Sequence, residues 1–281
     1  MTARLDVRKT YKLYIGGEFP RSESGRSYPA TDANGSVIAR VASASRKDLR
    51  DAVRAARTAQ SGWAERTGYN RGQILYRIAE MIEDRAATFA DLLLDTGLSQ
   101  RSARSEVAAS IDRMVWYAGW ADKFAQIYGN LNPVAGPFFN ISTPEPTGVV
   151  GIVAPAEPAL LGLVSRLAPV VVSGNSTVVL ASEPWPLPAI TFTEALESAD
   201  VPAGVINVLT GNTAELAFWL ASHMDVNAVD VAGADTDVGY KVEQEAVHNV
   251  KRVITGDVDS QSPYLIASFT ETKTVWHPKG L

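Results

Sequence analysis

The fold is decided by residues 149–154, which read Val-Val-Gly-Ile-Val-Ala. An apolar run of this length without polar alternation is typical of a strand buried on both faces. A helical segment at 159–171 and a second apolar run at 177–181 follow it directly. The alternation continues, with apolar runs at 205–209, 228–231 and 250–255 and helical segments at 187–198, 214–222 and 236–248. This pattern predicts an α/β protein with a Rossmann-like, doubly wound parallel sheet.

The residues before this region are predicted to be N-terminal helices. Ser45 and Asp48 have the spacing of a capping box, and apolar residues recur at helical spacing after them. Asn70 is expected to start a second helix, and residues 107–118 carry the apolar stripe of a third. We therefore expect the first third of the chain to be helical and to pack on the sheet.

Two stretches do not fit the alternation and are predicted to form an extended arm. Residues 128–146 are rich in Gly, Pro and Asn, which is typical of a hairpin. Residues 264–276 are rich in Thr and alternate in polarity, which predicts a strand without a sequential partner. The apolar side chains expected on this arm are Phe138, Phe139, Ile141, Leu265, Phe269 and Val275.

Composition excludes several classes of function. The net charge is -5, and no Lys/Arg run marks a nucleic-acid site. Glu157 and Arg166 interrupt the longest apolar stretch, residues 148–172, so it cannot span a membrane as one helix. Residues 1–9 lack the apolar segment of a secretion signal, so a cytoplasmic location is expected. The chain has no cysteine, which excludes disulfides, thiolate metal sites and a cysteine nucleophile.

Three phrases carry a family resemblance: YIGGEF at 14–19, YAGWADK at 117–123 and GVINVLTG at 204–211. In this order and spacing they resemble the aldehyde dehydrogenase superfamily. The resemblance implies a coenzyme-binding domain from residues 1–127 and 147–258, and an oligomerisation arm from 128–146 and 264–281. In the family this arm reaches across a dimer and extends a sheet in the neighbour's catalytic domain. Here the catalytic domain is expected to be absent, because residues 256–261 leave the family pattern and 269–275 resemble the family's C-terminal strand.

The resemblance also implies that the catalytic groups are missing. The family needs a cysteine nucleophile, an oxyanion-stabilising asparagine and a general-base glutamate. The asparagine would stand in the turn at 155–159, where this chain has Glu157, whose simpler role is to lie near the positive end of the following helix. The glutamate would fall near Gly256, where only Asp257 offers a carboxylate. We expect no catalytic residue and no metal site.

Coenzyme contacts implied by the resemblance are also altered. The family lysine that contacts the adenosine ribose aligns with Leu180, so only Glu183 of that phrase remains. Gly233 and Gly239 match the glycines at the pyrophosphate helix, but their spacing is one residue longer and Asp235 stands between them. A carboxylate at a helix N-terminus can take up the N–H groups that would bind phosphate. We expect no bound cofactor, with NAD as the one candidate.

Three hypotheses follow. The first is a non-catalytic subunit that assembles with a full-length NAD(P)-dependent aldehyde dehydrogenase paralogue and stabilises or regulates it. The second is an NAD-binding subunit that contributes to an active site in such a complex. The third is a stand-alone homo-oligomeric binding protein. None of them involves nucleic acid or a membrane.

Overall fold

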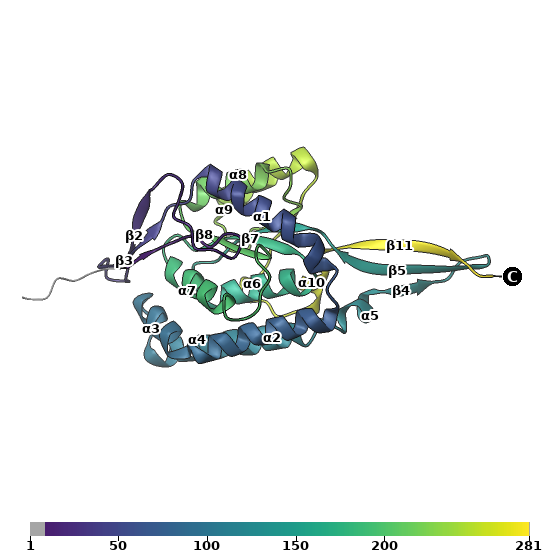
Figure 1. Cartoon of the computed structure of the whole chain (residues 1–281), viewed down its shortest axis with the longest axis horizontal. Coiled ribbons are helices and arrows are strands. Elements are labelled where there is room, and N and C mark those ends of the chain that lie inside the picture. The colour runs from purple at the N-terminus through teal and green to yellow at the C-terminus, as the bar shows by residue number, and fades with distance from the viewer. Residues whose placement is uncertain (1–8, 281) are drawn as a thin grey trace, which may run out of the picture.

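The computed structural model describes residues 9–280. At its centre is a five-stranded sheet in the order β10-β9-β6-β7-β8, in which every neighbouring pair is parallel. Its strands are β6 (Val149–Val153), β7 (Ser176–Leu180), β8 (Ile206–Leu209), β9 (Ala228–Asp230) and β10 (Arg252–Ile254). The helices between them are α6 (Leu161–Val172), α7 (Pro186–Leu196), α8 (Thr213–Ser222) and α9 (Thr236–Ala246), with a 3-10 turn at Val247–Asn249. The predicted α/β alternation is confirmed (Figure 1).

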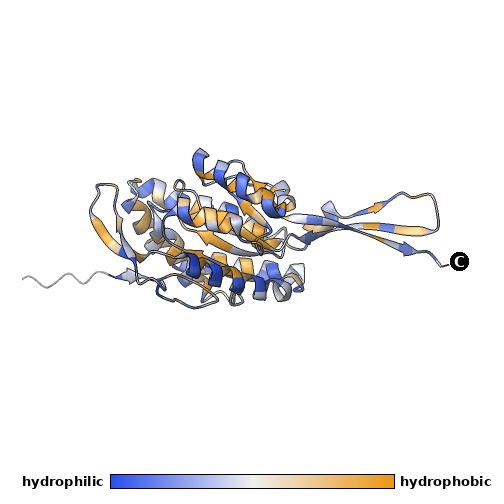
Figure 2. Ribbon diagram, turned by 90° about the horizontal axis from the view of Figure 1, so that it is seen from above, coloured by the Kyte–Doolittle hydropathy of each residue, from blue (hydrophilic) through white to orange (hydrophobic). Residues whose placement is uncertain are grey.

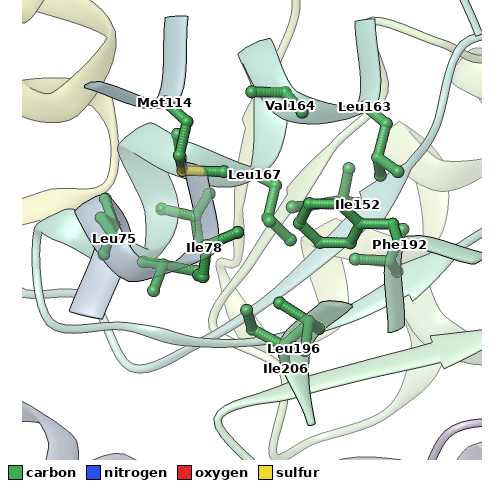
Figure 3. Close-up of a cluster of buried hydrophobic side chains, with 14 of the residues drawn as sticks. Leu75, Ile78, Met114, Ile152, Leu163, Val164, Leu167, Phe192, Leu196 and Ile206 are labelled. Atoms are coloured by element: carbon green, nitrogen blue, oxygen red, sulfur yellow. The ribbon is translucent and has the colours of Figure 1, made fainter. Parts of the chain in front are cut away.

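Alternating strand residues supply two separate cores, one on each face of the sheet. Val150 and Ile152 point into the larger core, which α6 and α7 share with three N-terminal helices, α2 (Gly68–Asp84), α3 (Ala86–Asp95) and α4 (Gln100–Ala118), and with Trp63. Val149 and Val153 point into the second core, with α1 (Arg46–Ala64), α8 and α9. Figure 3 shows the larger core, where Ile152 lies among Leu167 of α6 and side chains of α2, α4 and α7. Both faces are therefore covered, which explains the continuous apolar runs.

The N-terminal region differs in part from the prediction. Residues 10–42 form a small sheet rather than helix, in the order β1-β3-β2, so the expectation of an entirely helical first third is wrong. Its strands are β1 (Thr10–Tyr11), β2 (Ser27–Thr31) and β3 (Val37–Ala42). The capping box of Ser45 and Asp48 is confirmed at the start of α1. The second helix begins at Gly68 with Thr67 as its cap, earlier than Asn70. The N-terminal helices are α1 (Arg46–Ala64), α2 (Gly68–Asp84), α3 (Ala86–Asp95) and α4 (Gln100–Ala118).

An extended arm projects from one end of the body (Figures 1 and 2). It follows the short helix α5 (Phe124–Tyr128) and consists of β4 (Asn130–Asn132), β5 (Phe138–Pro146) and β11 (Thr270–Pro278). These strands form an antiparallel sheet in the order β11-β5-β4. The tail strand therefore pairs with a strand of its own chain that is distant from it in sequence, which agrees with the prediction of a strand without a sequential partner.

The beginning of the tail is helical, which corrects its predicted role. Residues Pro263–Ser268 form α10, because the Ser262 hydroxyl accepts a hydrogen bond from the Tyr264 N–H and Pro263 occupies the first helical position. Leu265 and Phe269 are 8% and 0% exposed and belong to the larger core. They were expected on the arm surface, but they are not available to a partner there.

Within residues 9–280, no helix is long and apolar enough to cross a membrane. Residues 1–8, on which the cytoplasmic expectation partly rests, lie outside the described part of the chain.

Candidate functional site

The carboxyl edge of a parallel sheet is where open α/β proteins bind their ligands. The chain runs from β6 to β7 and β8 on one side, and then to β9 and β10 on the other. The crevice between β6 and β9 is therefore the topological switch point, where open α/β sheets bind their ligands. Gly233 and the N-terminus of α9 lie at this crevice.

Gly233 closes the crevice by close backbone packing. A Cβ atom on Gly233 would lie 2.3 Å from the Pro155 nitrogen and 2.4 Å from the Val153 carbonyl oxygen. Only glycine fits this approach, so packing alone accounts for Gly233. Gly239 lies within α9, and an added Cβ would meet no atom of residues 9–280 within 4 Å. The two candidate glycines therefore have different environments, and neither identifies a phosphate site by itself.

The N-termini of three helices at this edge are occupied by the protein's own carboxylates. Asp235 caps α9, accepting a hydrogen bond from the Val238 N–H at 2.8 Å. Glu183 accepts from the Thr213 N–H at the start of α8, at 2.9 Å. Glu106 of α4 accepts from the N–H groups of Leu160 and Leu161 at the start of α6, at 2.8 and 3.2 Å.

These contacts leave little for an anionic ligand to bind. A helix N-terminus attracts phosphate through its unpaired N–H groups and its dipole, and a carboxylate at the same end competes for both. The carboxylate expected at the positive end of α6 was Glu157, but the structure places Glu106 there and leaves Glu157 exposed. Leu180, which replaces the expected lysine, is 1% exposed in the core.

A groove of about 500 Å³ lies between α8 and α9. Phe218 and Trp219 form its apolar wall, and its charged lining consists of Lys241 with Glu215 and Glu245. The two carboxylates outnumber the single ammonium group, so the groove is poorly matched to a phosphate. Among residues 9–280, no three His, Cys, Asp or Glu side chains gather into a metal-binding group.

Beneath the crevice lies a buried ion pair that the sequence analysis did not identify. Arg166 of α6 donates through Nε to Asp230 Oδ2 at 2.8 Å, and its Nη2 lies 2.7 Å from the same oxygen without a well-aligned N–H. Burial raises the pKa of the Asp230 carboxyl, while Arg166 and the Ala232 N–H favour its ionised form. A lone arginine in an apolar helix and a lone aspartate in an apolar strand were the available signals, since buried charges need partners.

The same arginine holds part of the segment that was expected to leave the family pattern. Arg166 Nη1 donates to the Asp257 carbonyl at 3.2 Å, and Arg113 of α4 donates to the carbonyls of Asp259 and Ser260. The Asp257 side chain is exposed. Residues 257–260 are therefore attached to the body through their backbone, and Asp257 is not arranged as a general base.

The arm offers a free strand edge. Thr147 N–H donates to the Phe269 carbonyl, and Lys279 N–H donates to the Pro137 carbonyl, at opposite ends of the β5–β11 ladder. The backbone N–H and C=O groups of successive residues point to opposite edges of a strand. The two hydrogen bonds therefore show that the backbone groups of the odd-numbered residues of β11 point toward β5. The N–H and C=O groups of Thr272, Thr274 and Trp276 consequently point away from it. Within the described chain, no strand pairs with this outer edge.

The arm also has one apolar and one polar face. Leu131, Ile141 and Val275 stand opposite one another across β4, β5 and β11 and are 65%, 46% and 46% exposed. Phe139 lies two residues from Ile141 on the same face and is 41% exposed. We call these four residues the apolar row.

The opposite face carries a hydrogen-bonded network. The amide of Asn132 donates to Asn140 and Ser142, and the Ser142 and Thr274 hydroxyls lie 2.8 Å apart. Phe138 belongs to this face and packs edge-on against Trp276. Of the six residues expected on the arm, Phe138, Phe139, Ile141 and Val275 are on it.

Comparisons with known proteins agree with this architecture. The aldehyde dehydrogenase family profile matches residues 21–275. A putative aldehyde dehydrogenase of Bacillus subtilis is 32% identical, over 95% of this chain and 54% of its own length. Retinal dehydrogenase 2 of Gallus gallus is 32% identical, over 94% of this chain and 51% of its own length.

Solved structures give the same result. A putative aldehyde dehydrogenase from Burkholderia cenocepacia superposes with a TM-score of 0.84 and 30% identity, covering 88% of this chain and 50% of that one. The NAD+ complex of an aldehyde dehydrogenase from Bacillus cereus gives a TM-score of 0.82 and 27% identity, with the same coverage. The chain spans about half the length of these relatives. The resemblance inferred from the three phrases is confirmed, and the chain belongs to the aldehyde dehydrogenase family.

Proposed function

We propose that this chain is a non-catalytic, cytoplasmic subunit that assembles with a full-length NAD(P)-dependent aldehyde dehydrogenase and stabilises or regulates it. The observation that carries the proposal is the arm, which combines a strand edge that no other strand of residues 9–280 pairs with and an exposed apolar row. The missing chemistry supports it, because the chain has no cysteine to act as the nucleophile.

The edge of β11 lacks the features by which proteins protect exposed strands. β11 is nine residues long, and from Glu271 onward every residue is exposed. Its one lysine, Lys273, is paired with Glu145 across the ladder, and its one proline stands at the end, at position 278. Exposed edges are normally shortened, bulged or interrupted by charge and proline, since they otherwise pair with another chain. This edge is therefore suited to binding a strand.

A full-length family member is the partner whose chemistry fits. In the family the arm extends a sheet in the neighbour's catalytic domain, and the region of this chain matched to its relatives covers about half their length. Strand addition would bond the outward groups of Thr272, Thr274 and Trp276, and the apolar row would lie against the partner. Hydrogen bonds to the backbone supply affinity, and side-chain pockets supply specificity.

The proposal is tested by co-expressing the tagged chain with a full-length aldehyde dehydrogenase from the same genome. Thr272→Pro removes one outward N–H without touching the β5 ladder, and Thr272→Val keeps the N–H and the β-branched shape. We expect the wild type and Thr272→Val to co-purify with the enzyme and Thr272→Pro to lose it. Co-purification of all three, or of none, would contradict strand addition through β11.

A further inference from the structure

The backbone groups of β11 that are free to bind another strand occupy only a short segment of its outward edge. We call this segment the window, and it has a defined central residue. On one side it is limited by Thr270, whose carbonyl already accepts a hydrogen bond from Arg252 Nη1 at 2.7 Å. On the other side it is limited by Pro278, which has no N–H to donate. Between them, the outward groups of Thr272, Thr274 and Trp276 have no partner strand among residues 9–280. Thr274 is the midpoint of this window.

A window that is symmetric about one residue can pair with itself. If two copies meet edge to edge in antiparallel orientation around a two-fold axis at Thr274, then Thr274 faces Thr274 of the second copy and Thr272 faces Trp276 of the second copy. Every outward N–H and C=O from Thr272 to Trp276 then finds a partner. We propose that, without another partner, this chain forms a homodimer through β11 with its two-fold axis at Thr274.

The side chains are compatible with this register. Lys273 would face Val275 of the second copy and Glu271 would face His277 of the second copy, so no like charges stand opposite each other. The two Val275 side chains would be diagonal neighbours, and so would the two Lys273 side chains, each of which is already paired with Glu145 of its own arm. An axis at Lys273 would instead place two lysines opposite each other. An axis at Val275 would leave the Thr272 carbonyl facing the proline nitrogen of the second copy.

The geometry also limits the assembly to two copies. The two three-stranded sheets would merge in the order β4-β5-β11-β11-β5-β4, with β4 at both outer edges. β4 has only three residues and is followed by Pro133, so it offers little for further strand addition. A dimer is expected rather than a fibre. The inference concerns the isolated chain and does not rest on the proposed enzyme partner, although both would use the same edge and so compete for it.

A single cysteine tests both the dimer and its register, because the chain has none of its own. Hydrogen-bonded residues on antiparallel strands have Cα atoms about 5.5 Å apart, which suits a disulfide. Thr274→Cys in the purified full chain should therefore give a covalent dimer under mild oxidation with copper phenanthroline. Thr272→Cys is the control on the same edge. Its two copies would be separated by four residue steps, roughly 13 Å, so it should not cross-link.

Light scattering, which measures the mass of the particle in solution, tests on two further variants whether the dimer forms through the β11 edge or through another surface. Thr274→Pro should give a monomer, while Thr274→Val, which keeps the N–H and loses the hydroxyl contact to Ser142, should remain a dimer. Circular dichroism checks that both variants are folded. A monomeric wild type, a dimer that survives Thr274→Pro, or cross-linking by Thr272→Cys in preference to Thr274→Cys would each overturn the proposal. None of these results decides whether a full-length enzyme binds, which the co-purification experiment measures separately.

Discussion

Arg166 and Asp230 form an ion pair that is 1% and 0% exposed at its two side chains. It joins α6 to the end of β9, and through the Asp257 carbonyl it also holds the segment that leads to the tail. A charge that is buried this completely depends on its partner, because desolvation of an unpaired charge costs several kcal/mol.

Arg166→Met should therefore lower the free energy of unfolding by about 3–5 kcal/mol, since Asp230 would be left uncompensated. The double variant Arg166→Met/Asp230→Leu should be markedly more stable than the single one, because it removes both charges. Urea unfolding followed by circular dichroism measures both. Equal losses in the single and double variants would mean that packing, and not the charge pair, sets the cost.

The part of the tail next to the body should contribute to the free energy of unfolding, and the exposed strand that follows it should not. Phe269 is fully buried, so Phe269→Ala should cost about 3–5 kcal/mol. Val275→Ala lies on the exposed apolar row and should cost less than 1 kcal/mol in the isolated chain, roughly the range of surface substitutions. Removing residues 264–281 should unfold the body, because Leu265 and Phe269 leave with them. A stable truncated body would contradict the core role assigned to α10.

Whether a strand or helix of this fold could be predicted depends on how clear its sequence pattern is. The parallel sheet could be predicted because its strands are buried on both faces and read as apolar runs. The small sheet of β1, β2 and β3 could not, because its strands are short and carry polar residues such as Arg40 and Thr31. In the tail, the alternating pattern favoured a strand, although Ser262 followed by Pro263 is a helix-start signal.

The candidate site was predictable only in part. Asp235 at the start of α9 could be read locally, because a capping residue lies next to its helix. Glu106 and Glu183 are distant in sequence from the helices they bind, by 54 and 30 positions, so no local pattern reveals them. Arg166 and Asp230 are likewise brought together only by the fold.

Coenzyme binding should be absent or weak. With the N-termini of α8 and α9 occupied by Glu183 and Asp235, NAD would have to displace a carboxylate before its phosphates could bind. Calorimetry of the isolated chain with NAD should show no binding in the micromolar range, with an NAD-dependent family member as the positive control. Micromolar affinity would favour the hypothesis of an NAD-binding subunit.

The isolated chain should not oxidise aldehydes. It lacks a cysteine, and Glu157 and Asp257 are exposed side chains without the arrangement of an oxyanion site or a base. NADH formation with short aliphatic and aromatic aldehydes, followed at 340 nm, should remain at the rate of a heat-denatured sample. Turnover above that background by the pure chain would refute the non-catalytic role.

Stability should rise with pH in the weakly alkaline range because of Lys251. Its ammonium group donates to the His223 and Val226 carbonyls, and burial lowers its pKa to about 8. An unfolded lysine titrates near 10.4, so between about pH 8 and 10 the unfolded chain binds more protons than the folded one. Folding is therefore increasingly favoured as the pH rises through this window.

Lys251→Met should remove that dependence. The comparison is the change in unfolding free energy between about pH 7.5 and 9.5 in urea, for wild type and variant. The wild type should gain more stability than Lys251→Met over this interval. Parallel pH profiles would show that Lys251 does not titrate there.

We propose above that the chain functions as a subunit that assembles with a full-length aldehyde dehydrogenase. The most direct measurement is to tag the chain at its own chromosomal locus, purify it gently and determine by native mass spectrometry what is bound in stoichiometric amounts. We predict a complex that contains a full-length family member with its catalytic cysteine, and loss of that complex in Thr272→Pro. Recovery of the chain alone, or as a homodimer while the full-length enzyme is present in the same cells, would contradict it.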